Sequence, residues 1–461
     1  MAHLYISAAH KSSGKTTLSV GLAAALTRRG HNVKTFKKGP DYIDPLWLQR
    51  ATDHPCYNLD FNTQNADEIT GLFARKLAGS DIGLIEGNKG LYDGVALDGR
   101  DSNAALAVML QAPVILVIDV MGITRGIAPL LVGYRAFEPD VDIAGVIFNK
   151  VVSPRQEDKL RASVERYTDV SVVGSVPRDN NLLAPERHLG LVPPSESDHV
   201  SERINELAKM METSVDIDRL LEISQLAPPP PPPRPAPAIT SAPGKLRVGI
   251  ARDSAFGFYY QDDLEALENA GAQLVFFNTL EDPKLPAVDG LFLGGGFPET
   301  HMKALQDNKT LRADIKAVAQ NGLPIYAECG GLMYLSKQIS WRDEIAHMVG
   351  FIPGSVTMHE KPQGRGLVRL QETGKGSWPK RCDDDQPATI MAHEFHYASL
   401  EGLPDDTVFA HKVLRGHGIN GAHDGIIMGN VQAGFCHHRT TTQNDWAVRF
   451  VDFVRRCKIG E

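Results

Sequence analysis

Short apolar runs alternate with helix-like stretches through the first half of the chain. HLYISA (3–8) precedes TTLSVGLAAALTRRG, and further strand-like runs follow in HNVKTFK, IGLIEG, PVILVIDV, IAGVIFNKV and VSVVGSVP. β-branched runs that end in Gly, Asp or Asn, with helical segments between them, are typical of a parallel sheet buried on both faces. We therefore predict a parallel α/β domain over residues 1–226.

The same alternation restarts in the second half. KLRVGIARD, AQLVFFN, GLFLGGG and LPIYAEC are predicted strands, and a helix is expected near Gln261–Ala270. No internal repeat relates the two halves. We predict a second α/β domain over residues 244–461, so the fold class is α/β throughout.

A proline-rich segment, residues 227–243, separates the two patterns. Its six consecutive prolines exclude a helix interior or a central strand and favour an extended, semi-rigid spacer. The alternative is a proline-rich ligand for the recognition domain of a partner. The strong patterns on both sides favour a linker.

Composition and charge exclude several classes of protein. The 461 residues are 42% hydrophobic with a formal net charge of -8 and no long basic run, so we expect no nucleic-acid partner. No apolar run approaches the roughly 20 residues that span a bilayer, and a lysine precedes any signal-type apolar core. The five cysteines lack CxxC spacing, which argues against disulfides or structural zinc and predicts a cytoplasmic protein.

A phosphate-binding loop is predicted between the first strand and the first helix. Residues 9–16 read AHKSSGKT, with Ala9 where the first glycine of such loops is usual. The backbone N–H groups and the helix N-terminus are suited to phosphate, Lys15 to the β- and γ-phosphates, and the Thr16 hydroxyl to Mg²⁺. The expected nucleotide contacts are Ser12, Ser13, Gly14, Lys15, Thr16 and Thr17.

Acidic residues stand where the neighbouring strands are expected to end. They are Asp41 and Asp44 in KKGPDYIDP, Glu86 in IGLIEG, Asp93 in GLYDG and Asp119 in PVILVID. Ligands of open parallel sheets bind beyond the carboxyl ends of the strands. One such acid is usually a solvated loop residue, but several beside a phosphate loop would hold Mg²⁺ and place the acceptor for phosphoryl transfer.

A second reactive site is predicted around Cys329. IYAECGGL (325–332) reads as strand, sharp turn and helix, and small residues after Cys329 permit the strained turn of a nucleophile elbow. Three glycines follow a strand: Gly294, Gly295 and Gly296. Together with Gly330 they are expected to supply the N–H groups of an oxyanion hole. A lone cysteine is more often a buried structural residue. The surrounding glycines favour the nucleophile.

Two adjacent histidines in AGFCHHRT are candidates for the general base of this site. His437 is preferred and His438 stays open.

With these motifs the sequence resembles the cobyrinic acid a,c-diamide synthase family over almost the whole chain. The strongest matches are FKKGPDYIDP, IEGNKGLYDG, PERHLGLVP (185–193), ARDSAFGFYY (251–260), GGGFPE, AECGGLMYL and HEFHY (393–397). The resemblance implies a dethiobiotin-synthetase-like ATP domain joined to a class I glutamine amidotransferase domain of the triad kind. It also implies amidation of the a and c acetate carboxylates of a tetrapyrrole with ATP, Mg²⁺ and L-glutamine.

The resemblance also implies roles for individual residues. The implied catalytic residues are Cys329 as nucleophile, His437 as its base, Asp41, Asp44 and Glu86 in activation, and Asp93 in handling substrate or intermediate. The implied metal ligands are Thr16, Asp41, Asp44 and Glu86. Arg439 occupies the place, two residues after the histidine, where triad amidotransferases usually have a glutamate. The third member of the triad is therefore open.

The substrate contacts are predicted from the chemistry of a carboxylated macrocycle. Lys37, Lys38, Arg187 and His188 are expected to bind carboxylates, and Tyr259 and Tyr260 to pack on the macrocycle face. Solvated surface charge and core packing are the alternatives. Asn149 is expected either to contact adenine or to cap its strand. A homodimer is a candidate oligomeric state.

The substrate and the class of protein each have an alternative. The polar loop and the second cation, Lys38, look like the branch of the family that amidates sirohaem. A protein of another class, a P-loop partition or assembly ATPase, is the second alternative. Such an ATPase would carry a lysine nearer the start of the loop, but Lys11 lies one residue too late. It would also leave the Cys329 elbow unexplained. A regulatory protein with an inactive amidotransferase domain is distinguished by a glutaminase assay.

Overall fold

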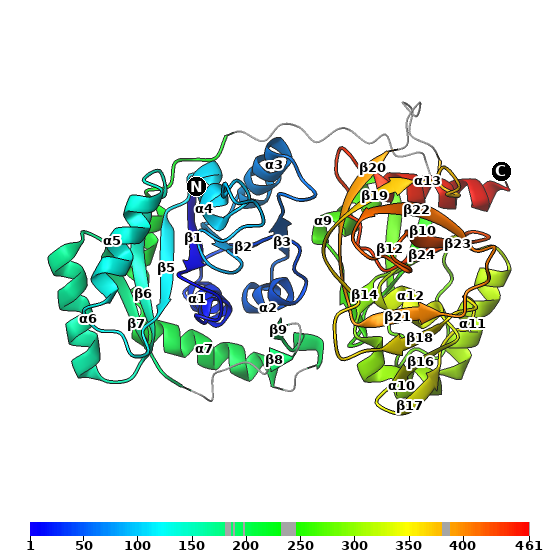
Figure 1. The fold of residues 1–461 in the computed structure, drawn as a ribbon, viewed down its shortest axis with the longest axis horizontal. Coiled ribbons are helices and arrows are strands. Elements are labelled where there is room, and N and C mark those ends of the chain that lie inside the picture. The colour runs from blue at the N-terminus through cyan, green and yellow to red at the C-terminus, as the bar shows by residue number, and fades with distance from the viewer. Residues whose placement is uncertain (180–185, 188–189, 197–198, 232–245, 380–387, 461) are drawn as a thin grey trace. The chain divides into compact units, whose positions relative to one another are not determined.

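The chain folds into two units with separate sheets. A computed structural model describes residues 1–179, 186–187, 190–196, 199–231, 246–379 and 388–460 (Figure 1). The units are Met1–Pro235 and Ala236–Glu461. Most of the predicted linker, 227–243, lies outside the described residues, because its description stops at residue 231.

The first unit contains the predicted parallel sheet. Its strand order is β3-β2-β4-β1-β5-β6-β7, and all neighbouring strands run parallel. The strands are β1 (Ala2–Ala8), β2 (Val33–Lys38), β3 (Cys56–Leu59), β4 (Ile82–Glu86), β5 (Val114–Asp119), β6 (Ile143–Val151) and β7 (Ser171–Pro177). A two-residue pair, β8 (Glu186–Arg187) and β9 (Gly190–Leu191), lies apart from it.

Helices follow the strands, as the alternating pattern predicts. They are α1 (Lys15–Arg28), α2 (Ile43–Thr52), α3 (Ala66–Leu77), α4 (Asn103–Leu110), α5 (Ile127–Phe137), α6 (Pro154–Tyr167), α7 (Val200–Ser214) and α8 (Ile217–Ser224), with the 3₁₀ turn η1 (Pro194–Glu196). Local signals set several starts: Asn65 and Glu68 form a capping box on α3, and Ser153 caps α6.

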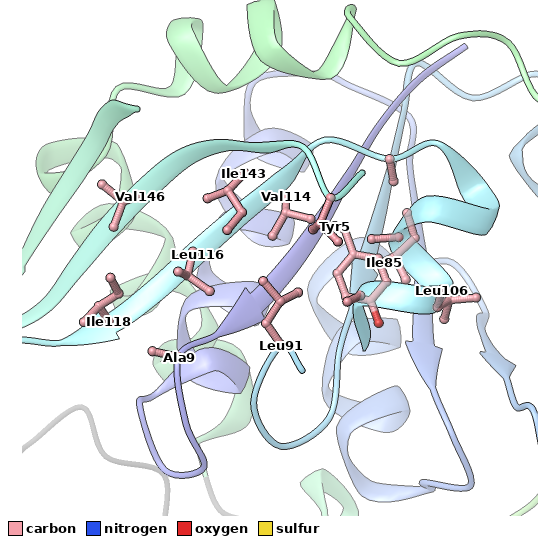
Figure 2. Close-up of a cluster of buried hydrophobic side chains, with 14 of the residues drawn as sticks. Tyr5, Ala9, Ile85, Leu91, Leu106, Val114, Leu116, Ile118, Ile143 and Val146 are labelled. Atoms are coloured by element: carbon pink, nitrogen blue, oxygen red, sulfur yellow. The ribbon is translucent and has the colours of Figure 1, made fainter. Parts of the chain in front are cut away.

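The core of the first unit lies between the sheet and helices α3–α6. Figure 2 shows Tyr5 of β1, Ile85 of β4, and Leu116 and Ile118 of β5 pointing into the same cluster as Leu106 of α4. Successive strand residues point to opposite faces of the sheet. Because these strands are apolar on both faces, helices must cover both faces of the sheet. Helix α1 packs against α2 and α7.

The second unit contains a mixed sheet of nine strands in the order β12-β10-β13-β15-β24-β23-β22-β19-β20. Its first five strands are parallel and its last four pair antiparallel. The strands are β10 (Leu246–Ala251), β12 (Ala272–Phe277), β13 (Gly290–Leu293), β15 (Ile325–Glu328), β19 (Gly364–Glu372), β20 (Thr389–His396), β22 (Val408–Arg415), β23 (His423–Met428) and β24 (Val431–Gly434).

Smaller elements complete the second unit. Two small sheets consist of β11 (Phe256–Phe258) with β14 (Gly295–Gly296), and of β16 (Gln338–Trp341), β17 (Glu344–His347), β18 (Ser355–Met358) and β21 (Ala398–Glu401). The helices are α9 (Gln261–Asn269), α10 (Met302–Asp307), α11 (Lys309–Gln320), α12 (Gly330–Leu335) and α13 (Trp446–Ile459), with the 3₁₀ turn η2 (Pro298–His301). The predicted parallel strands and the helix at 261 are confirmed.

The antiparallel half of this sheet, β19 to β23, was not among the predicted elements.

In the parts of the chain that the structure describes, no helix has both the length and the apolar character needed to cross a bilayer.

Candidate active sites

The loop between β1 and α1 has the backbone shape of a phosphate cradle. Ser12 and Gly14 take positive φ angles of 65° and 85°, whereas Ala9 does not, so alanine fits where glycine is usual. A Cβ atom on Gly14 would lie 2.2 Å from Asn149 Nδ2. Ser13 is buried and donates its hydroxyl hydrogen to the His10 carbonyl at 2.8 Å. Thr17 is half-buried in the first turn of α1.

Asn149, at the end of β6, supports this loop. Its Nδ2 donates to the Ser13 carbonyl at 2.8 Å and its Oδ1 accepts from the Lys150 amide at 3.0 Å. The strand-end role therefore describes Asn149 better than contact with adenine. Lys150, which was not predicted, donates to Asp119 Oδ2 at 2.6 Å and to the Ser12 carbonyl at 3.4 Å.

Lys37 lies at the centre of the predicted carboxylates. The β2–β4 register places Lys37 beside Glu86, and the start of α2 supplies Asp44. Lys37 Nζ lies 2.5 Å from Asp44 Oδ2, 3.0 Å from Glu86 Oε1 and 3.9 Å from Asp41 Oδ2. Its side chain is only 1% exposed. The expectation that Lys37 faces a substrate carboxylate is therefore wrong, because the acids of its own unit take up its charge.

Burial and charge pairing shift the pKa values of this cluster in opposite directions. Burial raises the pKa of Asp41 to about 7, with the nearby Asp44 carboxylate adding to the rise. Burial alone would raise the pKa of Asp44 as well, but the charge of Lys37 and a hydrogen bond from it lower that pKa below the ordinary value. Lys15 Nζ lies 4.0 Å from Glu86 Oε1, and burial lowers its pKa.

Oxygen atoms beside the phosphate loop suit Mg²⁺. Thr16 Oγ1 donates to Asp44 Oδ2 at 3.2 Å and to Glu86 Oε1 at 2.7 Å. Glu86 Oε2 is buried and has no hydrogen-bond partner among the described residues. Within the same described ranges, no three His, Cys, Asp or Glu side chains form a ready metal cage. The arrangement fits an ion held by one or two carboxylates together with phosphate oxygens, as Mg²⁺ prefers.

Asn103, another residue that was not predicted, joins the loop after β4 to β1. Its Nδ2 donates to the carbonyls of Asn88 and Gly90 at 2.5 and 2.6 Å, and its Oδ1 accepts from the Asn88 amide and the Tyr5 hydroxyl. Asp93 is exposed, and its carboxylate accepts from the Gly90 amide at 3.1 Å. Asp93 thus lies at the surface beside the nucleotide loop.

Two apolar side chains follow Asp93 at the surface. Val95 is 60% exposed and Leu97 is fully exposed, while the Asp101 carboxylate accepts hydrogen bonds from the amides of Val95 and Ala96. An ordered loop that presents apolar side chains to solvent is a candidate contact surface. We call residues 94–101 the apolar loop.

Lys38, another predicted substrate cation, is not placed at an open surface. Lys38 is 6% exposed, its Nζ lies 3.5 Å from Asn88 Oδ1 and 5.8 Å from the centre of the Phe61 ring, and burial lowers its pKa to about 8. Lys38 therefore has internal neighbours, and its contact with a substrate carboxylate stays a prediction. His188 and the side chain of Arg187 lie outside the described residues.

In the second unit, Cys329 occupies a strained turn between β15 and α12. Its φ and ψ angles are 48° and −103°, and its amide donates to the Gly434 carbonyl at 2.7 Å. A Cβ on Gly331 would lie 2.1 Å from the Leu293 carbonyl oxygen, so only glycine permits this close crossing. Such strain costs about 1–3 kcal/mol and is typical of functional positions. The geometry is that of the predicted nucleophile elbow.

Of the two candidate histidines, His437 lies next to the nucleophile. Burial lowers its pKa, but hydrogen bonding to the Cys329 and Glu328 side chains outweighs burial and raises the pKa to about 10. His437 Nδ1 lies 3.4 Å from Glu328 Oε2. His438 instead packs against the rings of Tyr326 and His411, and burial lowers its pKa to about 3.

Not all of the predicted glycines are free to bind an oxyanion. The Gly294 amide donates to the Tyr259 hydroxyl at 3.0 Å, so the expectation for Gly294 is wrong. A Cβ on Gly330 would lie 3.0 Å from the Gly296 amide nitrogen, so these two backbones meet beside Cys329. A Cβ on Gly295 would lie 2.6 Å from His437 Cε1, so this glycine makes room for the imidazole.

Tyr259 and Tyr260 pack inside the second unit instead of facing a macrocycle. The Tyr259 hydroxyl donates to the Ala251 carbonyl at 2.5 Å and accepts from Gly294. Tyr260 is 2% exposed, and its hydroxyl lies 3.2 Å from His393 Nδ1. The core-packing alternative describes both residues better, because the Tyr259 ring packs on Phe292 and the Tyr260 ring on His393.

Arg439 is fully buried and has a structural contact. Its Nε and Nη2 donate to Asp262 Oδ2 at 3.0 and 2.8 Å, and its guanidinium lies over the Tyr260 ring.

Glu328, which directly precedes Cys329, was missed in the sequence because a glutamate at a strand end is usually a solvated residue.

The fold and the two sites define a class of protein. It is a ligase whose chain contains a P-loop unit and a glutamine amidotransferase unit. The family model described as a CobB/CobQ-like glutamine amidotransferase domain matches residues 247–445, and the one described as an AAA domain matches residues 2–186.

Curated relatives match nearly the full length. Cobyrinate a,c-diamide synthase from Magnetococcus marinus is 44% identical, with 98% of this chain and 97% of the relative covered. The enzymes of that name from Archaeoglobus fulgidus (39% identical, 96% of each chain) and Methanosarcina acetivorans (38%, 94% of this chain and 91% of the relative) also match. The chain belongs to the cobyrinate a,c-diamide synthase family.

Proposed function

We propose that this protein uses ATP and glutamine to amidate the a and c acetate carboxylates of cobyrinate. The observation that carries the proposal is the presence, in one chain, of a P-loop carboxylate cluster and a Cys329–His437 elbow, each within a family match. Near-complete coverage of relatives named for this reaction supports the substrate.

The first unit activates the carboxylate. A carboxylate is a poor electrophile because its leaving group would be oxide, whereas an acyl phosphate has a good leaving group. Lys15 and the N-terminus of α1 bind the phosphates of ATP and favour transfer of the γ-phosphoryl group. Thr16, Asp44 and Glu86 would hold Mg²⁺, which when bound offsets charge on the phosphoryl oxygens. Lys37 keeps these carboxylates together as counter-ion.

The second unit supplies ammonia. The Cys329 thiolate attacks the glutamine side-chain amide, and the N–H groups of Gly296 and Gly330 stabilise the oxyanion. Protonated His437 donates a proton to the leaving ammonia. The resulting glutamyl thioester is hydrolysed by water, with neutral His437 as general base. Ammonia then attacks the acyl phosphate, which forms the amide and releases phosphate.

The apolar loop is suited to a macrocycle. Val95 and Leu97 offer exposed apolar area beside the exposed carboxylate of Asp93. A tetrapyrrole presents a broad apolar face with carboxylates at its edge, so an apolar side chain near the phosphoryl-transfer site gains free energy from burial by the substrate. Lys38, the cation that pointed toward sirohaem, is buried and gives no reason to prefer another macrocycle.

Replacement of the nucleophile tests the division of labour. Cys329→Ala should abolish glutamine-dependent amidation and leave amidation with added ammonium salt largely intact, because the first unit keeps its residues. The readout is the mass of cobyrinate after incubation with ATP and Mg²⁺, where each amide replaces an oxygen by a nitrogen. Loss of both activities in a folded variant would overturn the proposal.

Replacement of the phosphate lysine is the complementary experiment. Lys15→Ala should remove amidation with either nitrogen source while basal glutamine hydrolysis persists. An unchanged rate of amidation in this variant would contradict the assignment of the nucleotide site.

A further inference from the structure

The base of a Cys–His pair needs a partner for its second ring nitrogen. A carboxylate there fixes the tautomer and orientation of the imidazole and stabilises its protonated form. Arg439, two residues after His437, cannot supply one, because it is a cation bonded to Asp262. The carboxylate must come from another part of the fold.

The Glu328 carboxylate lies beside this nitrogen. Its Oε2 lies 3.4 Å from His437 Nδ1, and both side chains are at least 96% buried. Its Oε1 accepts from the Tyr326 hydroxyl at 2.5 Å and from the His438 amide at 2.8 Å. The carboxylate is therefore fixed at one oxygen by two donors, and the other oxygen faces the imidazole.

Other buried acids nearby have different partners. The Glu394 oxygens accept from the amides of His417 and Gly418, and Asp424 accepts from the amides of Phe435 and Cys436. His393 stacks on the face of the His437 ring, with centroids 4.9 Å apart and planes 13° apart. Stacking covers a face of the ring and leaves its in-plane nitrogens to other groups.

We propose that Glu328 is the positioning carboxylate of the glutaminase site: it orients His437 toward Cys329 and stabilises the protonated imidazole opposite the thiolate. This inference rests on the proposed glutaminase function. Glu328, directly before the nucleophile, thus supplies the carboxylate that Arg439 cannot supply. One strand end, β15, then delivers both the nucleophile and the group that orients its base.

The charge of Glu328 should also set the pH range of the reaction. The groups that face His437 are Cys329 and Glu328 from the elbow, and His393, His438 and Arg439 from β20 and the segment after β24. The two acids favour protonated His437, and the basic neighbours oppose it. Without the Glu328 charge the pKa of His437 falls, so the protonated form is lost at lower pH.

Glu328→Gln is the test, with glutamine hydrolysis by the full-length protein as the assay. The amide keeps an acceptor for Tyr326 and His438 but removes the charge. We expect kcat to fall by about 10- to 100-fold with KM for glutamine little changed. The alkaline limb of the kcat/KM profile should move to lower pH. Glu328→Asp should recover part of the loss.

Glu394→Gln is the matched control, because it neutralises a buried carboxylate in the same unit without touching His437. It should keep the kcat and pH profile of the wild type. If Glu328→Gln does not fold, Tyr326→Phe provides the second variant, since it keeps the charge and loosens its orientation; a smaller fall in kcat is expected.

The outcomes separate the inference from the proposed function. An inactive wild type would remove the proposed function itself. An active wild type together with a folded Glu328→Gln variant of unchanged kcat and pH profile would overturn the role of Glu328 alone. A fall in kcat with an unmoved pH profile would also overturn it, because general damage to the fold has that signature.

Discussion

At the scale of single residues, the first unit depends on buried charges that balance one another. Lys37 is surrounded by Asp41, Asp44 and Glu86, and burial alone would lower its pKa, yet these carboxylates raise it well above the ordinary value. Removing Lys37 would leave buried carboxylates uncompensated, which costs about 3–5 kcal/mol when a buried pair loses one partner. Asp41 is the half-exposed member, and its pKa is about 7.

Asp41→Asn should stabilise the protein most at alkaline pH. The folded-state pKa of Asp41 lies above its unfolded value, so its contribution favours folding at low pH and is lost as pH rises through about 7. The variant should therefore gain free energy of unfolding, by about 1 kcal/mol after solvent screening, near about pH 8 and less near about pH 5. Urea denaturation at both pH values is the measurement. A wild type more stable than the variant at the higher pH would contradict the assignment.

At the scale of elements, short turns place the reactive groups. The elbow between β15 and α12 requires two backbones to cross at Gly331, and the phosphate loop requires Gly14 beside Asn149. The apolar loop is held by Asp101 and exposes Leu97. Each of these segments depends on one or two close contacts, so each can be tested by one substitution.

Gly331→Ala should disrupt the elbow. The added Cβ would lie 2.1 Å from the Leu293 carbonyl oxygen, a backbone atom that cannot move without shifting β13. Overpacking of this kind costs about 1–3 kcal/mol, and glutaminase activity should be lost. Gly376→Ala is the control, since its nearest neighbour would be the Gln432 side chain at 3.8 Å. Thermal unfolding and glutamine hydrolysis of the two variants check the comparison.

Leu97→Ser should weaken binding of the macrocycle without changing stability. The side chain is fully exposed, so the folded protein loses no packing, but the apolar contact with the substrate would be lost. The loss of one apolar contact is worth about 1–3 kcal/mol, so KM for cobyrinate should rise by roughly 10-fold or more while ammonia-dependent kcat persists. Leu226→Ser, at another exposed leucine of the same unit, should leave KM unchanged. Equal KM values in both variants would remove the apolar loop from the substrate site.

At the scale of the whole molecule, each unit has its own core and its own reactive site. The clusters of buried side chains around β1 and around β15 contain residues of one unit only. A ligand that binds one unit stabilises that unit by mass action. The two chemistries should therefore be separable by ligand as well as by mutation.

Hydrogen exchange with bound nucleotide tests this separation. ATP with Mg²⁺ at about 100 times its Kd should add about 2.7 kcal/mol of stability, seen as slower exchange in the first unit. Lys15→Ala should abolish the protection, whereas Cys329→Ala should retain it. Protection that persists in Lys15→Ala would place the nucleotide elsewhere.

The sequence alone was enough for features that depend on neighbouring residues. The alternation of strands and helices, the AHKSSGKT loop, and the small residues around Cys329 predict local shapes, because backbone conformation follows from residues within one turn or strand. These predictions include the parallel strands of both units, whereas the choice between His437 and His438 was left open. The antiparallel strands β19 to β23 were missed, because their pairing joins segments far apart in the chain.

Only the tertiary structure decided which partner each reactive group has. Lys37 reads in the sequence as a free cation, and the β2–β4 register turns it into the counter-ion of Asp44 and Glu86. Glu328 reads as an ordinary strand end until the segment after β24 brings His437 to it. Charges and hydrogen bonds act over a few ångströms in space, and residue spacing along the chain does not encode those distances.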